Sequence, residues 1–496
     1  MPPPIPPVPP ATPRTDRRAA VRRAARQAAR QTARQAHHPT PLASAESPVV
    51  AALAADGPLY DAVLTLLTTV LAPDGHSRPT CKRLALLITG LLAGERGTPS
   101  AVAHTAFTLG IGTAEQEPSV ARRVARLLDD PQLDPARLLP PLARAVLPVL
   151  LAEAARAHDH SIGAGARPSP HHARWRGVRL VIDETTHTDQ THVLVVGLAY
   201  RGVVVPLGLR TWPQTAPQPL GAYWDRLASL LLEVYGALPP ALRPHVLVLG
   251  DRFYGVPPVL DLLSTLGWAC VLRVQGQTRV RLPDGTERAL RTLVPHPGTY
   301  WTGYELPFPG PEAAPPAAPL AVFKSAGWRA LQVVAAWVPG QAEPWLLVTT
   351  LPATRARLRD YAIRWAIERL FLGWKSHGWD LEATAAAPRR LARLLTGYVV
   401  ATWWLLAAAL PVATAQLARL AAHMGRAPRH PVQLPLPWSA PTVPWPAKRS
   451  LLTYGRQAFA QVDARVRRPP VCWRFPAWDA PAWSTECTAL YHGSAT

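Results

Sequence analysis

The sequence predicts a mixed α/β protein, with a helical N-terminal part followed by a core built on a β-sheet. Between residues 171 and 275, β-branched apolar runs alternate with helical stretches in the order β-β-β-α-β-α-β. Between residues 41 and 170, apolar runs such as Val63–Leu71 and Leu84–Leu92 alternate with polar breaks, which is typical of helices. The chain has 496 residues, 48% of them hydrophobic, which is enough for about two to four domains.

The expected elements of the core follow one another closely. The strands are Val178–Asp183, Val193–Tyr200, Val203–Leu209, Val246–Gly250 and Trp268–Val274, and the helices are Gly221–Tyr235 and Pro257–Leu266. Only Arg201 and Gly202 separate the second strand from the third, which indicates a tight hairpin. Residues 276–350 are rich in Pro and Gly with short β-like runs, so we expect a β-rich insertion there.

The remaining segments differ in composition. Residues 1–40 are a Pro-rich and then Arg/Ala-rich basic tail, in which Arg recurs every four residues from Arg18 to Arg34. Residues 41–170 are expected to form a helical DNA-binding domain, with residues 351–420 completing the core. Residues 421–496 are a Pro/Trp-rich C-terminal region with one amphipathic stretch, Leu451–Val466.

Charge and cysteine content narrow the function. Lys and Arg number 53 against 32 Asp and Glu, a net charge of +21 that favours a polyanionic partner, most often nucleic acid. Within 41–170, Ser100–Leu109 and Ser119–Leu128 could form a helix-turn-helix with Arg122, Arg123 and Arg126 on its second helix. A solvated basic face is the alternative. The four cysteines are far apart, which fits a reducing, cytoplasmic setting.

One apolar segment bears on the membrane question. Leu394–Ala418 is a segment of 25 residues without a charged residue, which is long enough for a membrane-spanning helix. Trp403 and Trp404 lie in its middle rather than at its ends, and Pro411 interrupts it. We therefore expect a buried pair of helices broken near Pro411 and no membrane contact.

Three carboxylates are candidates for a shared site. Asp183 ends the first strand and Asp251 ends the fourth, which can pair beside the first; Glu368 lies on a helical stretch at 355–377. Side chains at the carboxyl ends of strands usually face a crevice, and Mg²⁺ prefers oxygen ligands of this kind. A turn Asp that caps the next helix is the alternative for each Asp taken alone.

The helical stretch at 355–377 has two distinct faces. At about 100° per residue, Tyr361, Arg364, Glu368 and Lys375 lie within about 60° of arc, opposite an apolar face that includes Ile367. A carboxylate flanked by cations and a phenol suits a metal ligand among groups that hold phosphates. A solvated charged face with incidental Glu–Arg pairing is the alternative.

These residues resemble a known family. The pattern Y-x2-R-x3-E-x6-K, from Tyr361 to Lys375, resembles the Y-R-E-K signature of bacterial insertion-sequence transposases of the DDE type. The text VIDET around Asp183, GDRFYG around Asp251 and WLLVTTL at 345–351 resembles other motifs of that family. The resemblance covers about 178–400, under half the chain.

The resemblance implies an RNase H-like core of the retroviral integrase superfamily, β-β-β-α-β-α-β-α, interrupted by the β-rich insertion. It implies catalytic and metal-binding roles for Asp183, Asp251 and Glu368, with two Mg²⁺ ions for which Mn²⁺ can substitute. The DNA-contacting residues it implies are Tyr361, Arg364, Lys375, Trp365 and Arg252. The implied function is cut-and-paste transposition: metal-dependent cleavage of double-stranded DNA at the element ends, then strand transfer into target DNA, by a homodimer on paired ends in the bacterial nucleoid.

Several alternatives stay open at this point. The protein could be a transposase-derived DNA-binding protein without catalysis, or a metal-dependent nuclease without strand transfer. Trp365 could stack on a flipped base or pack in the core. Glu184 and Asp189 lie near Asp183 and could be decoys or supporting residues. A histidine cluster could bind zinc, although its spacing fits no standard site: His171, His172, His187 and His192.

Overall fold

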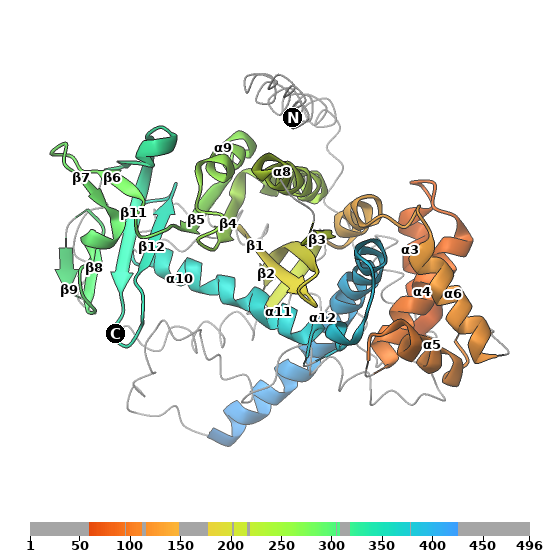
Figure 1. The fold of residues 1–496 in the computed structure, drawn as a ribbon. Helices are drawn as coiled ribbons and strands as arrows, with labels where there is room; N and C mark the ends of the chain where they lie inside the picture. The colour runs from red at the N-terminus through yellow and green to blue at the C-terminus, as the bar shows by residue number, and fades with distance from the viewer. Residues whose placement is uncertain are drawn as a thin grey trace, which may run out of the picture.

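The computed structural model describes residues 59–94, 96–111, 116–147, 177–200, 203–215, 219–303, 305–307, 318–376 and 378–424. These residues form a mixed α/β protein with a mostly helical N-terminal region and a central mixed sheet (Figure 1). This architecture agrees with the predicted class and is compatible with an RNase H-like fold.

The centre of the sheet is built from five strands in the order β3-β2-β1-β4-β5. They are β1 (Val178–His187), β2 (Thr191–Tyr200), β3 (Val203–Pro213), β4 (Val246–Gly250) and β5 (Ala269–Arg273). The first three pair antiparallel, with Tyr200 opposite Val203, and β4 and β5 run parallel to β1. All of β4 is buried, as expected for a parallel strand with both faces covered.

The segment after β5 extends this sheet. Strand β12 (Trp345–Thr349) pairs antiparallel with β5, and β11 (Arg329–Trp337) pairs with β12. Beyond β11 lie the short strands β10 (Leu320–Val322), β6 (Arg279–Arg281), β7 (Glu287–Ala289), β8 (Thr299–Trp301) and β9 (Glu305–Pro307). The strands of residues 276–350 thus continue the core sheet.

Helices cover both faces of the sheet (Figure 1). One face carries α8 (Leu220–Ala237) and α9 (Pro257–Leu266), and the other carries α10 (Ala356–Ala362), the 3₁₀ turn η4 (Ile363–Trp365), α11 (Ala366–Trp374) and α12 (Pro388–Met424). The expected break near Pro411 is wrong, because α12 is a single helix through that residue. A proline inside a helix removes one hydrogen bond, and packing elsewhere along the helix can compensate.

The N-terminal region consists of α3 (Leu59–Leu71), α4 (Arg78–Ala93), α5 (Pro99–Thr108), α6 (Glu117–Asp129) and a helix at 135–147. Ser77 and Thr98 cap α4 and α5 by accepting hydrogen bonds from backbone N–H groups of the first turn. The region packs on the core through α4 and α6, which contact α12, and polar contacts add to this packing. Arg390 of α12 pairs with Asp129, and the Trp379 indole donates to the Leu91 carbonyl over 2.8 Å.

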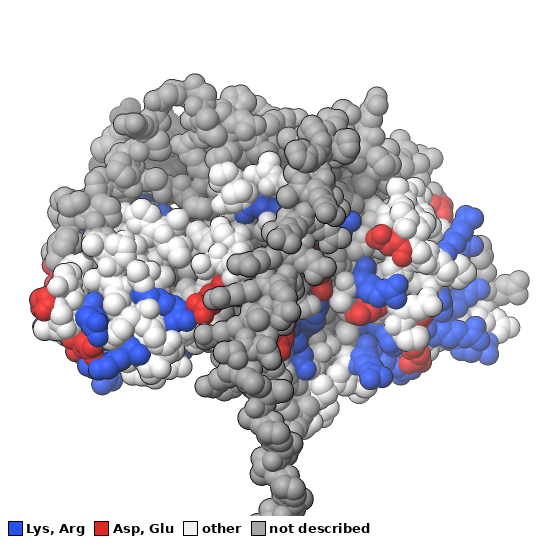
Figure 2. Space-filling view, turned by 90° about the horizontal axis from the view of Figure 1, so that it is seen from above, with Lys and Arg blue, Asp and Glu red and all other residues white. Residues whose placement is uncertain are grey.

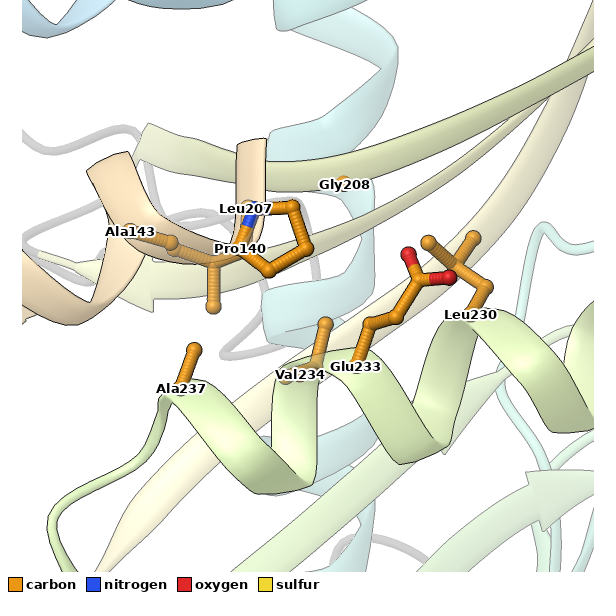
Figure 3. Close-up of a pocket in the computed structure, with 8 residues that line it drawn as sticks. All are labelled: Pro140, Ala143, Leu207, Gly208, Leu230, Glu233, Val234 and Ala237. Atoms are coloured by element: carbon orange, nitrogen blue, oxygen red, sulfur yellow. The ribbon is translucent and has the colours of Figure 1, made fainter. Parts of the chain in front are cut away.

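A third contact joins the helix at 135–147 to the core. Pro140 and Ala143 of that helix face Leu230, Val234 and Ala237 of α8 (Figure 3). Glu233 lies among these apolar side chains and pairs with Arg210 of β3. The contact couples the N-terminal helices to the face of the sheet that α8 covers.

Some predicted features lie outside the described residues. These are the basic tail at 1–40, the hairpin residues Arg201 and Gly202, His171 and His172, and the C-terminal region beyond Met424 with Leu451–Val466. Within the described part of the chain, no helix has both the length and the apolarity that crossing a membrane requires.

Candidate active site

Two of the predicted carboxylates lie on neighbouring parallel strands. The expectation that Asp183 ends the first strand is wrong, because β1 continues to His187 through its pairing with β2, and Asp183 lies within β1 beside the end of β4. Strands β1 and β4 pair with Ile182 opposite Gly250, so the next residue after this pair is Asp183 on β1 and Asp251 after β4. Neighbouring strands are about 4.8 Å apart, and residues opposite each other point to the same face. The Asp251 carboxylate accepts the Phe253 N–H over 2.9 Å, which fixes the loop that leaves β4.

The third carboxylate is tied to the first through an arginine. Arg364 Nη1 donates to Asp183 Oδ2 over 2.7 Å, and its Nη2 donates to Glu368 Oε1 over 2.8 Å. The Asp183 side chain is 13% exposed and that of Glu368 is 44% exposed. The structure therefore brings Asp183, Asp251 and Glu368 to one edge of the sheet, with Arg364 between two of them.

Asp183 is electrostatically unusual. Burial raises the pKa of its carboxyl to about 6, and the negative charges of Asp251 and Glu368 add to this effect. Arg364 and the Glu184 N–H, which donates to Asp183 over 2.9 Å, oppose the increase. A carboxylate that is both buried and close to two others is typical of a functional site, because the same charges that disfavour ionisation attract a cation.

The helical segment that carries Glu368 departs from the expected regular helix. Between α10 and α11, η4 is a 3₁₀ turn, which advances about 120° per residue rather than 100°. Over three residues this moves Glu368 from about −20° to about +40° relative to Tyr361, so the two residues remain on the same side of the segment. The two residues nevertheless differ in burial: Tyr361 is 1% exposed and makes a T-shaped ring contact with Trp345, whereas the Glu368 side chain is 44% exposed.

The other predicted DNA-contacting residues lie in different surroundings. Trp365 is 39% exposed, next to the buried Arg364. Lys375, at the end of α11, pairs with Glu382 over 2.9 Å. Arg252 is 54% exposed and lies 3.4 Å from Glu343. Of the five, Trp365 and Arg252 are exposed, Lys375 is partly exposed, and Tyr361 and Arg364 are buried.

A buried ion cluster supports α10 from behind. Asp360 accepts from Arg179 of β1 over 3.3 Å, and its second oxygen lies 3.3 Å from Arg357. The side chains of Arg357 and Asp360 are each only 5% exposed. Because a buried charge without its partner is costly, this cluster fixes α10 relative to β1 and thereby the position of Arg364.

Sequence reasoning missed an aromatic group beside Asp251. The Phe253 ring is 46% exposed and rests on Tyr223 and Trp224, with centroid distances of 4.9 and 5.5 Å. The Tyr223 hydroxyl lies 3.1 Å from that of the buried Tyr254. Two aromatic residues in the loop after a strand-end Asp were the signal in the sequence.

The neighbouring candidates have partners of their own. Glu184 bonds to His192, and Asp189 accepts from Thr186 in the turn after β1. His187 is buried and bonds to the Leu381 carbonyl and the Thr384 hydroxyl. In the described residues, neither His187 nor His192 belongs to a group of side chains placed to bind zinc.

The three carboxylates fit a divalent cation in their donor chemistry. They supply only oxygen atoms, which Mg²⁺ and Mn²⁺ prefer, and three negative charges exceed the single positive charge of Arg364. As the side chains stand, no three acidic, His or Cys residues of the described ranges are arranged to hold a metal ion directly. Instead, the Arg364 guanidinium forms ion pairs with two of the three carboxylates, Asp183 and Glu368.

Comparison with known proteins adds one finding. No curated protein matches the chain. Residues 230–404 match the family model described as a transposase DDE domain, a range that includes Asp251 and Glu368 and begins after Asp183. This match, over about a third of the chain, supports a transposase of the DDE type.

Proposed function

We propose that the protein is a DNA transposase of a bacterial insertion sequence, with an RNase H-like catalytic core. In this proposal it cleaves double-stranded DNA at the element ends and joins the freed ends to target DNA. The observation that carries the proposal is the convergence of Asp183, Asp251 and Glu368 at one edge of the sheet. The match to the transposase domain over residues 230–404 supports it independently.

Asp183, Asp251 and Glu368 are the residues that would hold two Mg²⁺ ions. When bound, such ions supply Lewis acidity at the scissile phosphate and offset the charge that develops there. The carboxylates contribute the negative charge that recruits the cations. Asp183 within β1 and Asp251 directly after β4 are held in place by the paired strands.

The residues around the carboxylates would hold the DNA. Arg364 and Lys375 are placed on one helical segment with Glu368, and their cations suit phosphate oxygens. Arg252 is exposed directly after Asp251. In this proposal Tyr361 positions Arg364 from beneath, and the exposed Trp365 and Phe253 rings offer surfaces on which an unpaired base could stack.

The helical N-terminal region supplies a candidate surface for recognising the element ends. Helix α6 presents Arg122 and Arg126 to solvent, and α5 precedes it. Figure 2 shows Lys and Arg side chains over the side formed by α3–α6, with acidic side chains interspersed among them. A basic helix surface of this kind suits phosphate contacts, and assembly as a homodimer on paired ends would bring two such surfaces to the DNA.

DNA that carries the gene's own flanking sequences tests this function. With Mg²⁺ or Mn²⁺, the full-length protein should nick that DNA at a defined flank and join the released ends to a second plasmid. EDTA and Asp251→Ala should abolish both reactions. Asp189→Asn is the matched control, since Asp189 is an acidic residue close to Asp183 that lies in an exposed turn where Asn is tolerated.

The outcomes separate the alternatives. Cleavage without joining would assign a nuclease, and binding at the flank without cleavage would assign a DNA-binding protein. Cleavage that persists in Asp251→Ala would contradict the proposed site.

A further inference from the structure

Arg364 occupies an unusual position among the three carboxylates. Its two terminal nitrogens contact different side chains, Asp183 over 2.7 Å and Glu368 over 2.8 Å. The guanidinium thus bridges the first and third carboxylates across the site. Both contacts are charge-assisted hydrogen bonds in good geometry, which are the stronger kind.

The bridge is held in place by its surroundings. Arg364 as a residue is 7% exposed and lies on the 3₁₀ turn between α10 and α11. Its guanidinium carbon lies 5.0 Å from the Trp365 ring centroid and 5.9 Å from that of Tyr361, distances at which aromatic rings attract a cation. The packing therefore presents the guanidinium to the carboxylates in one orientation.

A guanidinium and a divalent cation compete for the same oxygen atoms. A cation that binds Asp183 and Glu368 must displace the two hydrogen bonds of Arg364 or share the oxygens with it at the cost of like-charge repulsion. Asp251 is bound to a backbone N–H and not to Arg364, so it remains available to a cation.

We propose that Arg364 is a built-in counter-ion that competes with divalent cations for Asp183 and Glu368 and holds the cation affinity of the DNA-free protein low. This inference rests on the proposed cation site and adds a role for Arg364 before any DNA is bound. A phosphate that draws the guanidinium away would free both carboxylates, so DNA and cation binding would favour each other.

The test is a titration of the full-length, DNA-free protein with Mn²⁺, with free Mn²⁺ followed by electron paramagnetic resonance. Arg364→Gln should bind Mn²⁺ roughly tenfold or more tightly than the natural protein, because a competing charge at contact distance is removed. Arg369→Gln removes the same charge from the exposed face of α11, and its affinity should stay within about twofold, as expected of a screened surface charge. Asp251→Asn should weaken Mn²⁺ binding both in the natural protein and when it is combined with Arg364→Gln.

The variant Arg364→Lys covers the case in which Arg364→Gln does not fold. A single ammonium lacks the rigid fork that spans two carboxylates, so Arg364→Lys should bind Mn²⁺ with an affinity between those of the other two proteins. Equal or weaker Mn²⁺ binding by the Arg364 variants, with Asp251→Asn still impaired, would overturn the role of Arg364 and leave the cation site intact. No Mn²⁺ binding by any of the proteins would overturn both.

Discussion

The burial of Asp183 makes a prediction about stability and pH. Its pKa of about 6, against an ordinary value of 3.8, corresponds to about 3 kcal/mol of free energy that the folded protein loses when Asp183 is ionised. Below pH 3.8, the ordinary pKa of Asp, the Asp183 carboxyl is protonated in both the folded and the unfolded chain, so no stability is lost. As the pH rises, the unfolded chain ionises first, and the loss is complete once the pH exceeds the folded pKa.

Replacing Asp183 with Asn removes this dependence. In EDTA, the free energy of unfolding of Asp183→Asn relative to the natural protein should rise by about 2 kcal/mol between about pH 4.5 and 7.5. The pKa of about 6 already includes the attraction of Arg364 for the ionised Asp183, so this contact adds no separate pH dependence, and the trend with pH rather than the absolute difference is diagnostic. Urea unfolding at several pH values measures it, with Asp189→Asn as the matched control. If the difference in free energy of unfolding between Asp183→Asn and the natural protein does not change with pH, Asp183 is not in a buried environment crowded by carboxylates.

Three further predictions follow from other contacts. Asp360→Ala removes the buried carboxylate that pairs with the buried Arg357 and the partly exposed Arg179, so the free energy of unfolding should fall by about 3–5 kcal/mol in denaturant titration; a loss below about 1 kcal/mol would contradict the buried cluster. A Cβ at Gly97 would lie 2.0 Å from the Tyr398 hydroxyl, so Gly97→Ala should lower stability by about 1–3 kcal/mol, and an unchanged melting temperature would argue against this packing. Replacing both Arg122 and Arg126 with Ala should weaken DNA binding and reduce the slope of log affinity against log salt by about 2, whereas an unchanged slope would remove α6 from the DNA interface.

The sheet was largely predictable from the sequence, for a local reason. Val246–Gly250 is apolar throughout and is followed directly by an acidic residue, and this pattern depends on neighbours in the chain rather than on distant contacts. The pairing of β4 beside β1 followed from the order of elements, and it places Asp183 next to Asp251.

The contacts within the site were less predictable. Nothing in Ile363–Trp365 breaks a helix locally, so the 3₁₀ turn that separates Tyr361 from Glu368 reflects packing against the sheet rather than a local sequence signal. The choice of Arg364 as the partner of Asp183 depends on side chains 181 positions apart, which spacing along one helix does not encode. The continuity of α12 through Pro411 could likewise not be predicted from the general rule that a proline interrupts a helix.

The central claim is that three distant segments form one divalent-cation site. Fe²⁺ substituted for Mg²⁺ tests it most directly, because Fe²⁺ with ascorbate and peroxide cuts the polypeptide close to where the ion binds. We predict cuts in the full-length protein near Asp183, Asp251 and Glu368, all three suppressed by excess Mg²⁺ and by Asp251→Asn, with Asp189→Asn unchanged. Cuts at only one of these segments, or cuts elsewhere that Mg²⁺ suppresses, would contradict a shared site.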